Sequence, residues 1–156
     1  MFSSETYSIE DCLYYKTTEY SGTSMTTLNI SMPSTFKLEF DFKPTSRSSA
    51  SSYVEVGTST TNCLVIGQIT SSGTHGIWVR TNNNYSSTNP VSSSSELNTD
   101  NHVTFTYDGT DCSYTCNSET VTCSKPSYNL EKLLRVAPYT NNKLKNIKIK
   151  PLMVLI

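Results

Sequence analysis

The stretch NHVTFTYDGTDCSYTCNSETVTC, residues 101–123, predicts a set of antiparallel strands joined by tight turns. From His102 to Tyr107, apolar side chains alternate with threonines, which is the period of two of a half-buried strand. Asp108-Gly109 supplies a turn, because glycine accepts the positive φ that a tight hairpin needs. Asn117-Ser118 supplies a second turn and leads into a return strand over residues 119–123. We therefore expect this stretch to lie in an antiparallel sheet.

The cysteines of this stretch fall into register with one another. Counting back from the Asn117-Ser118 turn pairs Cys116 with Glu119 and therefore Cys112 with Cys123. Two cysteines that lie opposite each other on adjacent strands can form a disulfide, although the bond is strained in a hydrogen-bonded pair. We favour free thiols and leave the Cys112–Cys123 disulfide open. The chain has no Cys-x-x-Cys pair and its histidines lie far from the cysteines, so no zinc site is expected.

The clearest alternation of the chain lies in Phe36–Lys43, where four apolar residues alternate with four charged ones before Pro44. This pattern predicts a core strand with one solvated face. Tyr85–Ser95 is expected to be a loop, because it is too polar for a core element. Further short strands are expected at residues 53–56, 63–69, 76–81, 130–136 and 144–149.

Short strands, closely spaced turn signals and the lack of an amphipathic helix favour an all-β fold, an antiparallel two-sheet β-sandwich. The chain of 156 residues is the size of one domain and shows no linker or internal repeat. We expect residues 1–156 to form a single domain. Residues 1–35 are expected to supply irregular N-terminal strands, and residues 36–151 the core.

The composition is rich in hydroxyl groups and poor in charge. Ser and Thr make up 48 of the 156 residues, and charged residues are 16%, against roughly 25% in a typical domain. With a net charge of -1 and no basic patch, the chain is not expected to bind nucleic acid or an anionic membrane. The N-terminal MFSSETYSIE lacks the features of a signal peptide, and PLMVLI at the C-terminus is too short to span a bilayer. We expect no membrane insertion.

Four segments resemble a known family. Phe36–Pro44, FKLEFDFKP, resembles the opening core strand of laminin-G-like, concanavalin-A-type jelly rolls, and His102–Gly109, HVTFTYDG, is similar to their strand and turn. The hairpin that ends TCNSETVT stands where that family usually has a VNG turn, and Leu144–Pro151, LKNIKIKP, resembles its closing strand. The resemblance covers residues 36–151 and implies a concanavalin-A-like jelly roll.

The chain departs from this family at two positions. Asn101 replaces the tryptophan often found before the histidine, and Lys145 replaces a glycine of the closing strand. Both positions concern packing and turns. The Ser/Thr/Asn/Tyr-rich, weakly charged style further resembles adhesin modules of methanogenic archaea and the tail proteins of their viruses. That resemblance implies a location outside the cell or on a virion surface.

Catalysis is not expected, although concanavalin-A-like folds include glycosidases. Those that look like laminarinases carry E-x-D-x-(x)-E on one strand face, and here Glu39 and Asp41 are followed by Lys43 and Pro44 in place of the third acid. Retaining hydrolysis needs two carboxyl groups about 5–5.5 Å apart, one as the nucleophile and one as the acid. No nucleophile elbow surrounds any serine or cysteine. We expect a non-catalytic protein whose Glu39 and Asp41 lie on a solvated face with lysine counterions.

A calcium site is possible but not expected. Calcium takes six to eight oxygen ligands, several of them carboxylates. Asp100, Asp108 and Asp111 form the one acidic group in predicted loops, and Asp108 is better explained by its turn. We expect no cofactor.

The best candidate for ligand binding is a strand that leads into an asparagine-rich turn. On this strand Ile77 and Val79 would face the core, so that Trp78 and Arg80 share the outer face. Sugars are bound by an aromatic face beside amide, hydroxyl or guanidinium groups. The alternative is that Trp78 faces inward or that a loop covers the outer face. The predicted ligand-binding residues are His75, Trp78, Arg80, Asn82, Asn83, Asn84 and Tyr85.

These features favour a non-catalytic recognition module that binds a cell-surface glycan or cell-wall polymer at the tip of an adhesin or viral tail fibre. A homotrimer is the assembly expected of a fibre tip. The alternative is a structural module, such as a fibre or capsid decoration or a protein–protein interaction domain, that does not bind glycans.

Overall fold

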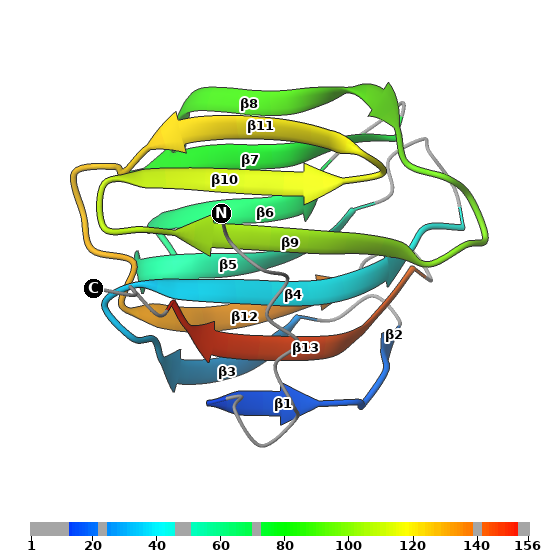
Figure 1. The fold of residues 1–156 in the computed structure, drawn as a ribbon, viewed down its shortest axis with the longest axis horizontal. Coiled ribbons are helices and arrows are strands. Elements are labelled where there is room, and N and C mark those ends of the chain that lie inside the picture. The colour runs from blue at the N-terminus through cyan, green and yellow to red at the C-terminus, as the bar shows by residue number, and fades with distance from the viewer. Residues whose placement is uncertain (1–12, 22–24, 46–50, 70–72, 139–141, 153–156) are drawn as a thin grey trace, which may run out of the picture.

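The computed structural model describes residues 13–21, 25–45, 51–69, 73–138 and 142–152. The described residues form β-strands and turns and contain no helix. The strands make two antiparallel sheets that pack face to face (Figure 1). The predicted all-β, two-sheet sandwich is therefore confirmed. In the described part of the chain, no helix is long and apolar enough to cross a membrane.

The seven-stranded sheet lies at the front of Figure 1. Its strands run in the order β1 (Tyr14–Lys16), β13 (Lys143–Pro151), β4 (Phe36–Lys43), β9 (Asn101–Tyr107), β10 (Asp111–Cys116) and β11 (Glu119–Ser124), and β2 (Tyr20–Ser21) also pairs with β13. The six-stranded sheet lies behind it. Its order is β3 (Thr26–Ser31), β12 (Lys132–Pro138), β5 (Ser52–Ser59), β6 (Asn62–Gln68), β7 (Thr74–Thr81) and β8 (Asn84–Ser94).

The strands β9, β10 and β11 form the unit predicted from residues 101–123. The observed pairing joins Cys116 to Glu119 and Cys112 to Cys123, as counted from the turn. Asn117 and Ser118 both have positive φ, 52° and 68°, which is the conformation of a two-residue hairpin turn whose twist matches the strands. The register predicted from this turn is therefore confirmed.

The main core lies between the sheets and follows the predicted alternation. Phe36, Leu38, Phe40 and Phe42 of β4 are fully buried, and the charged residues between them are partly exposed. The inner face of the six-stranded sheet completes this core with side chains such as Val54, Leu64, Ile66 and Ile77. Burial of these apolar surfaces is what holds the two sheets together.

Residues 84–94 form strand β8, so the prediction of a loop at Tyr85–Ser95 was wrong. β8 is the edge strand of the six-stranded sheet, and among the described strands it pairs only with β7. An edge strand needs little apolar content, because one side of it faces solvent. Val91 is its buried apolar anchor, and Pro90 lies in mid-strand, a position that edge strands tolerate.

Strand β3 at the opposite edge of the same sheet is also irregular. Asn29 has a positive φ of 51°, and the pairing of β3 with β12 shifts register between Leu133 and Arg135. The bulge in β12 also shifts its pairing with β5. Bulges bend a strand and re-aim its side chains. Here the bulge leaves Leu133 in the main core, while Leu134 joins a second cluster described below.

Candidate functional site on the outer face of the six-stranded sheet

The outer face is the side of the six-stranded sheet that points away from the seven-stranded sheet. Side chains alternate between the two faces of each strand, so residues between the core positions of β5, β6 and β7 lie on this outer face. Cross-strand pairing places Arg135, Glu55, Val65, Trp78 and Thr88 in one row across five neighbouring strands. The row brings an ion pair and the single tryptophan of the chain onto one surface.

A buried carboxylate lies in this row between two guanidinium groups. Glu55 has no exposed surface, and its Oε1 accepts a hydrogen bond from Arg80 Nη1 at 3.0 Å. Arg135 donates to both carboxylate oxygens, from Nε at 2.6 Å and from Nη2 at 2.8 Å. A two-pronged guanidinium–carboxylate pair is short, strong and fixed in orientation. Glu55 thus holds two arginine side chains in place on the outer face.

The two arginines remain positively charged in this setting. The hydrogen bond to Glu55 raises the pKa of Arg135. Burial of Arg80 disfavours its charge, but the interactions with Tyr85 and with Glu55 outweigh burial, and the pKa of Arg80 is raised. One carboxylate between two guanidiniums leaves one positive charge unbalanced. Lys132 lies in the neighbouring row, opposite Gly57, and is exposed.

Aromatic side chains flank this charged centre. The Tyr85 ring lies 5.2 Å from Arg80 Cζ, and its hydroxyl accepts a hydrogen bond from Arg80 Nη2 at 2.9 Å. Tyr85 is 48% exposed, one of the most exposed large apolar side chains among the described residues. Trp78 is half-buried and packs against a second apolar cluster on the outer face, formed by Tyr53, Cys63, Val65, Leu134 and Ala137.

The asparagines of the predicted site form the hairpin turn between β7 and β8. Asn82 and Asn83 have φ of 49° and 66°, which is the conformation that asparagine tolerates best after glycine. The Asn82 backbone N–H donates to Asn62 Oδ1 at 2.9 Å, and Asn84 Nδ2 donates to the Asn82 carbonyl at 3.2 Å. The three asparagines are exposed and lie next to Tyr85 in the chain. Their amide groups therefore extend the polar rim of the outer face.

His75 does not belong to this face. The structure places its ring in the core, with no exposed surface, where Nδ1 shares a hydrogen bond with the Tyr114 hydroxyl at 2.8 Å. Burial lowers the pKa of His75 to about 4. The strand begins at Thr74, so His75 has the same parity as the inward-facing Ile77. His75 lies two residues before Ile77, and this spacing was the signal that would have excluded His75 from the outer face.

Glu55 and Arg135 are the residues of this site that the sequence did not indicate. A charge within the apolar run Tyr53–Val56 was the available signal for Glu55. Its partners are 25 and 80 residues away along the chain, so only the strand order brings them together. The predicted orientation of the tryptophan strand is correct, since Ile77 and Val79 lie in the core and Trp78 and Arg80 do not.

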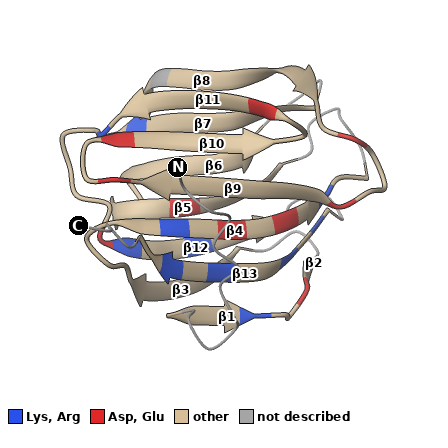
Figure 2. Ribbon diagram, viewed as in Figure 1, with Lys and Arg blue, Asp and Glu red and all other residues tan. Residues whose placement is uncertain are grey.

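A second charged cluster lies on the seven-stranded sheet, where charged residues gather on the neighbouring strands β4 and β13 (Figure 2). His102 contacts Asp41 at 2.7 Å through Nδ1 and Glu39 at 3.3 Å through Nε2. Lys150 Nζ lies 3.2 Å from Glu39 Oε2. His102 and the nearby lysines lower the pKa of Glu39 to about 2, and the two carboxylates raise the pKa of His102 to about 9. Glu39 is therefore not the protonated acid that glycoside hydrolysis needs.

Two of the three acidic residues considered for calcium, Asp100 and Asp108, have other partners. Asp108 Oδ1 accepts hydrogen bonds from the backbone N–H groups of Thr110 and Asp111, as expected of a turn residue. Asp100 pairs with Lys145 at 3.2 Å. Among the residues that the structure describes, no three His, Cys, Asp or Glu side chains are placed to hold a metal ion.

Comparisons with known proteins identify the fold. No protein-family model matches the chain, and no curated protein matches its sequence. A single mutant of congerin II has a TM-score of 0.63 and 12% identity over 81% of this chain and 100% of that chain. Galectin LEC-6 of Caenorhabditis elegans gives 0.60 and 13% over 93% and 99%, and chicken galectin 2 gives 0.57 and 7% over 83% and 99%. The chain thus has a concanavalin-A-like jelly-roll sandwich fold, as these structures do.

Proposed function

We propose that this domain is a non-catalytic, lectin-like module that binds a glycan on the outer face of the six-stranded sheet. The observation that carries the proposal is that buried Glu55 fixes Arg80 and Arg135 on the same sheet face as half-buried Trp78. An aromatic face can lie against the C–H groups of a sugar ring, and fixed guanidinium groups can donate to its hydroxyls. The fold of a congerin II structure liganded by lactose and MES is similar, with a TM-score of 0.61, which supports this choice of ligand class.

Glycans that carry a carboxylate or sulfate are the preferred ligands in this proposal. Glu55 balances only one of the two arginines, and exposed Lys132 adds a positive charge in the next row. Arginine recognises carboxylate and sulfate-like groups through paired N–H donors. Binding of an acidic glycan should weaken as salt is raised from low to physiological concentration, because partly exposed charges are screened.

The experiment is a glycan array that presents neutral sugars beside their uronic acid and sulfated counterparts. Trp78→Ala should abolish binding while changing the melting temperature little, because the side chain is only partly buried. Tyr85→Ala should weaken binding about tenfold through the loss of the ring beside Arg80. Tyr15→Ala is the matched control, since the Tyr15 ring has Lys148 5.4 Å away on the opposite sheet.

Two results would contradict the proposal. Equal loss of binding in the Tyr15 and Tyr85 variants would remove the outer face as the site. A large fall in melting temperature for Trp78→Ala would make Trp78 a packing residue.

A second candidate function is protein–protein contact through the same face. Exposed Tyr85 and half-buried Trp78 favour it, since aromatic side chains are enriched at protein contact surfaces. A domain that binds no glycan and no cells, yet assembles with its own parent protein, would establish this candidate in place of the first.

The proposed location is extracellular or on a virion surface, at the tip of an adhesin or tail fibre. The Ser/Thr-rich, weakly charged composition of the chain is the feature that supports it. A cell-wall polymer would serve as ligand there, and repeated display in a homotrimer would raise the avidity of weak single sites. Analytical ultracentrifugation measures the assembly. One of the similar structures is of a homodimeric agglutinin from chicken liver, CG-16, so a dimer is the competing outcome.

A further inference from the structure

Two free thiols lie opposite each other at the edge where β11 faces β8. Cys112 of β10 and Cys123 of β11 are directly paired in register, and both are free cysteines. Cys112 is fully buried in the main core, whereas Cys123 is partly exposed. The disulfide left open from the sequence is therefore not formed in this structure, although the two residues occupy the positions that it would need.

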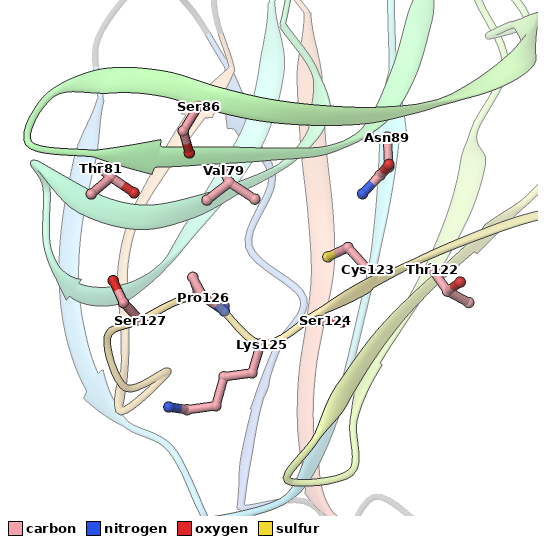
Figure 3. Close-up of a pocket in the computed structure, with 10 residues that line it drawn as sticks. All are labelled: Val79, Thr81, Ser86, Asn89, Thr122, Cys123, Ser124, Lys125, Pro126 and Ser127. Atoms are coloured by element: carbon pink, nitrogen blue, oxygen red, sulfur yellow. The ribbon is translucent and has the colours of Figure 1, made fainter.

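Cys123 borders a pocket of about 520 Å³ between the two sheets. Val79 of β7 and Asn89 of β8 line one side of this pocket, and Ser124 and Pro126 line the other. Figure 3 shows the Cys123 sulfur pointing into the space between these walls. A small reagent can therefore approach this sulfur from solvent.

The surroundings of Cys123 favour the thiolate, which is the reactive form of cysteine. A hydrogen bond from the Cys112 thiol lowers the pKa of Cys123, and a hydrogen bond from Asn89 acts in the same direction, against burial and the charge of Asp111. The other described thiols behave differently. Cys63 and Cys116 are buried, and burial raises the pKa of each to about 12.

We propose that Cys123 is a covalent modification site for low-molecular-weight disulfides such as glutathione disulfide, and that Cys112 resolves the adduct into an intramolecular disulfide. In the first step the Cys123 thiolate attacks one sulfur of the reagent. The reagent's S–S bond breaks, and one thiolate leaves and takes up the proton that Cys123 released. The product is a mixed disulfide at the mouth of the pocket.

In the second step the Cys112 thiolate attacks the Cys123 sulfur and displaces the second reagent thiol. The two cysteines are oxidised and the reagent disulfide is reduced to two thiols. The hydrogen bond to Cys123 is the main cause that raises the pKa of Cys112, followed by burial. This cause disappears once Cys123 carries the adduct, so the first step prepares the second.

The geometry allows the bond and makes it reversible. Directly opposed residues of a hydrogen-bonded antiparallel pair have Cα atoms about 5.5 Å apart, within the range of about 4.4–6.8 Å that disulfides span. The Cys116–Glu119 pair closes the hairpin and is a hydrogen-bonded pair. Hydrogen-bonded and non-hydrogen-bonded pairs alternate along the strands, so the Cys112–Cys123 pair, four residues further along, is hydrogen-bonded too. A disulfide at such a pair is strained and is reduced more readily than a relaxed one.

The test uses the full chain with Cys12→Ser as the common background, so that only the described thiols can react. Glutathione disulfide should remove two hydrogens from the intact mass and leave no bound glutathione. When Cys112→Ser is combined with the background substitution, a single glutathione adduct should accumulate, and peptide mapping should place it on Cys123. Cys123→Ser should gain no adduct, and Cys116→Ser should react like the background protein.

A kinetic measurement covers the case in which a cysteine variant does not fold. Iodoacetamide at neutral pH should label Cys123 of the background protein at least about tenfold faster than Cys116. Asn89→Ala should slow labelling of Cys123 about threefold and leave Cys116 unchanged. Equal labelling of both cysteines, or a first adduct on Cys112, would overturn the proposal.

Discussion

Glu55 shows how one residue can organise a surface. It lies on the outer face of β5 yet has no exposed surface, because two arginines and the neighbouring strands cover it. Its carboxylate would be costly to bury alone, and the arginines offset that cost with short hydrogen bonds. The same bonds fix Arg80 and Arg135 in the orientation on which the proposed ligand site depends.

Glu55→Gln should lower the free energy of unfolding by about 3–5 kcal/mol, because it leaves two adjacent guanidinium groups without their shared counter-charge. Urea denaturation at neutral pH measures the change. Glu131→Gln is the matched control on an exposed carboxylate, and it should change the stability by less than about 0.5 kcal/mol. A cost below about 1 kcal/mol for Glu55→Gln would show that water replaces the carboxylate.

The two histidines predict a stability that falls on both sides of neutral pH. The folded-state pKa of His75 is lowered by burial to about 4, below its ordinary value of 6.5. The stability from neutral His75 is therefore present above pH 6.5 and lost as the pH falls toward 4, by about 3 kcal/mol. The pKa of His102 is raised to about 9, so its contribution is present below pH 6.5 and lost as the pH rises toward 9.

Thermal unfolding across this range separates the two effects. His75→Gln should remove the loss between pH 6.5 and 4 and keep the loss between pH 6.5 and 9. His102→Gln should do the reverse, with a smaller amplitude because His102 is 55% exposed and its ion pairs are screened. An unchanged loss of stability below pH 6.5 in His75→Gln, or above pH 6.5 in His102→Gln, would contradict the assignment of that loss to that histidine.

At the scale of elements, the sequence predicted strand register where a tight turn sets it, and strand orientation where apolar and polar residues alternate. The Asn117-Ser118 turn determined the register of β10 and β11, since a two-residue hairpin leaves one pairing. The alternation of Phe36–Lys43 likewise predicted which side of β4 is buried. β8 was not predicted, because its place at the edge of a sheet, rather than its own apolar content, makes it a strand.

The turn between β10 and β11 offers a test at this scale. Ser118 has a positive φ of 68°, which costs a non-glycine residue about 1 kcal/mol. Ser118→Gly should therefore raise the free energy of unfolding by about 0.5–1 kcal/mol in urea denaturation. Ser113→Gly, in the middle of β10, is the control and should lower it by a similar amount. Destabilisation by Ser118→Gly would mean that the serine side chain supports the turn.

At the scale of the whole molecule, the sequence predicted the sandwich but only part of its candidate site. Trp78, Arg80 and the asparagine turn lie within one hairpin, so their association was readable from residues 74–85. Glu55 and Arg135 join them because β12, β5, β6 and β7 are neighbours in the sheet. That order depends on packing between distant segments, which no local pattern encodes. His75 was grouped with this site, and its burial was not predicted, because the strand starts earlier than its apolar residues indicate.

The irregular borders of the six-stranded sheet have a consequence for self-association. β8 carries Pro90 in mid-strand and β3 carries Asn29 in a left-handed conformation, so neither border presents a flat, regular template. These irregularities disfavour the edge-to-edge strand pairing by which sheets of neighbouring molecules join. Copies of the domain displayed side by side, as the proposed function requires, are therefore expected not to join through this sheet.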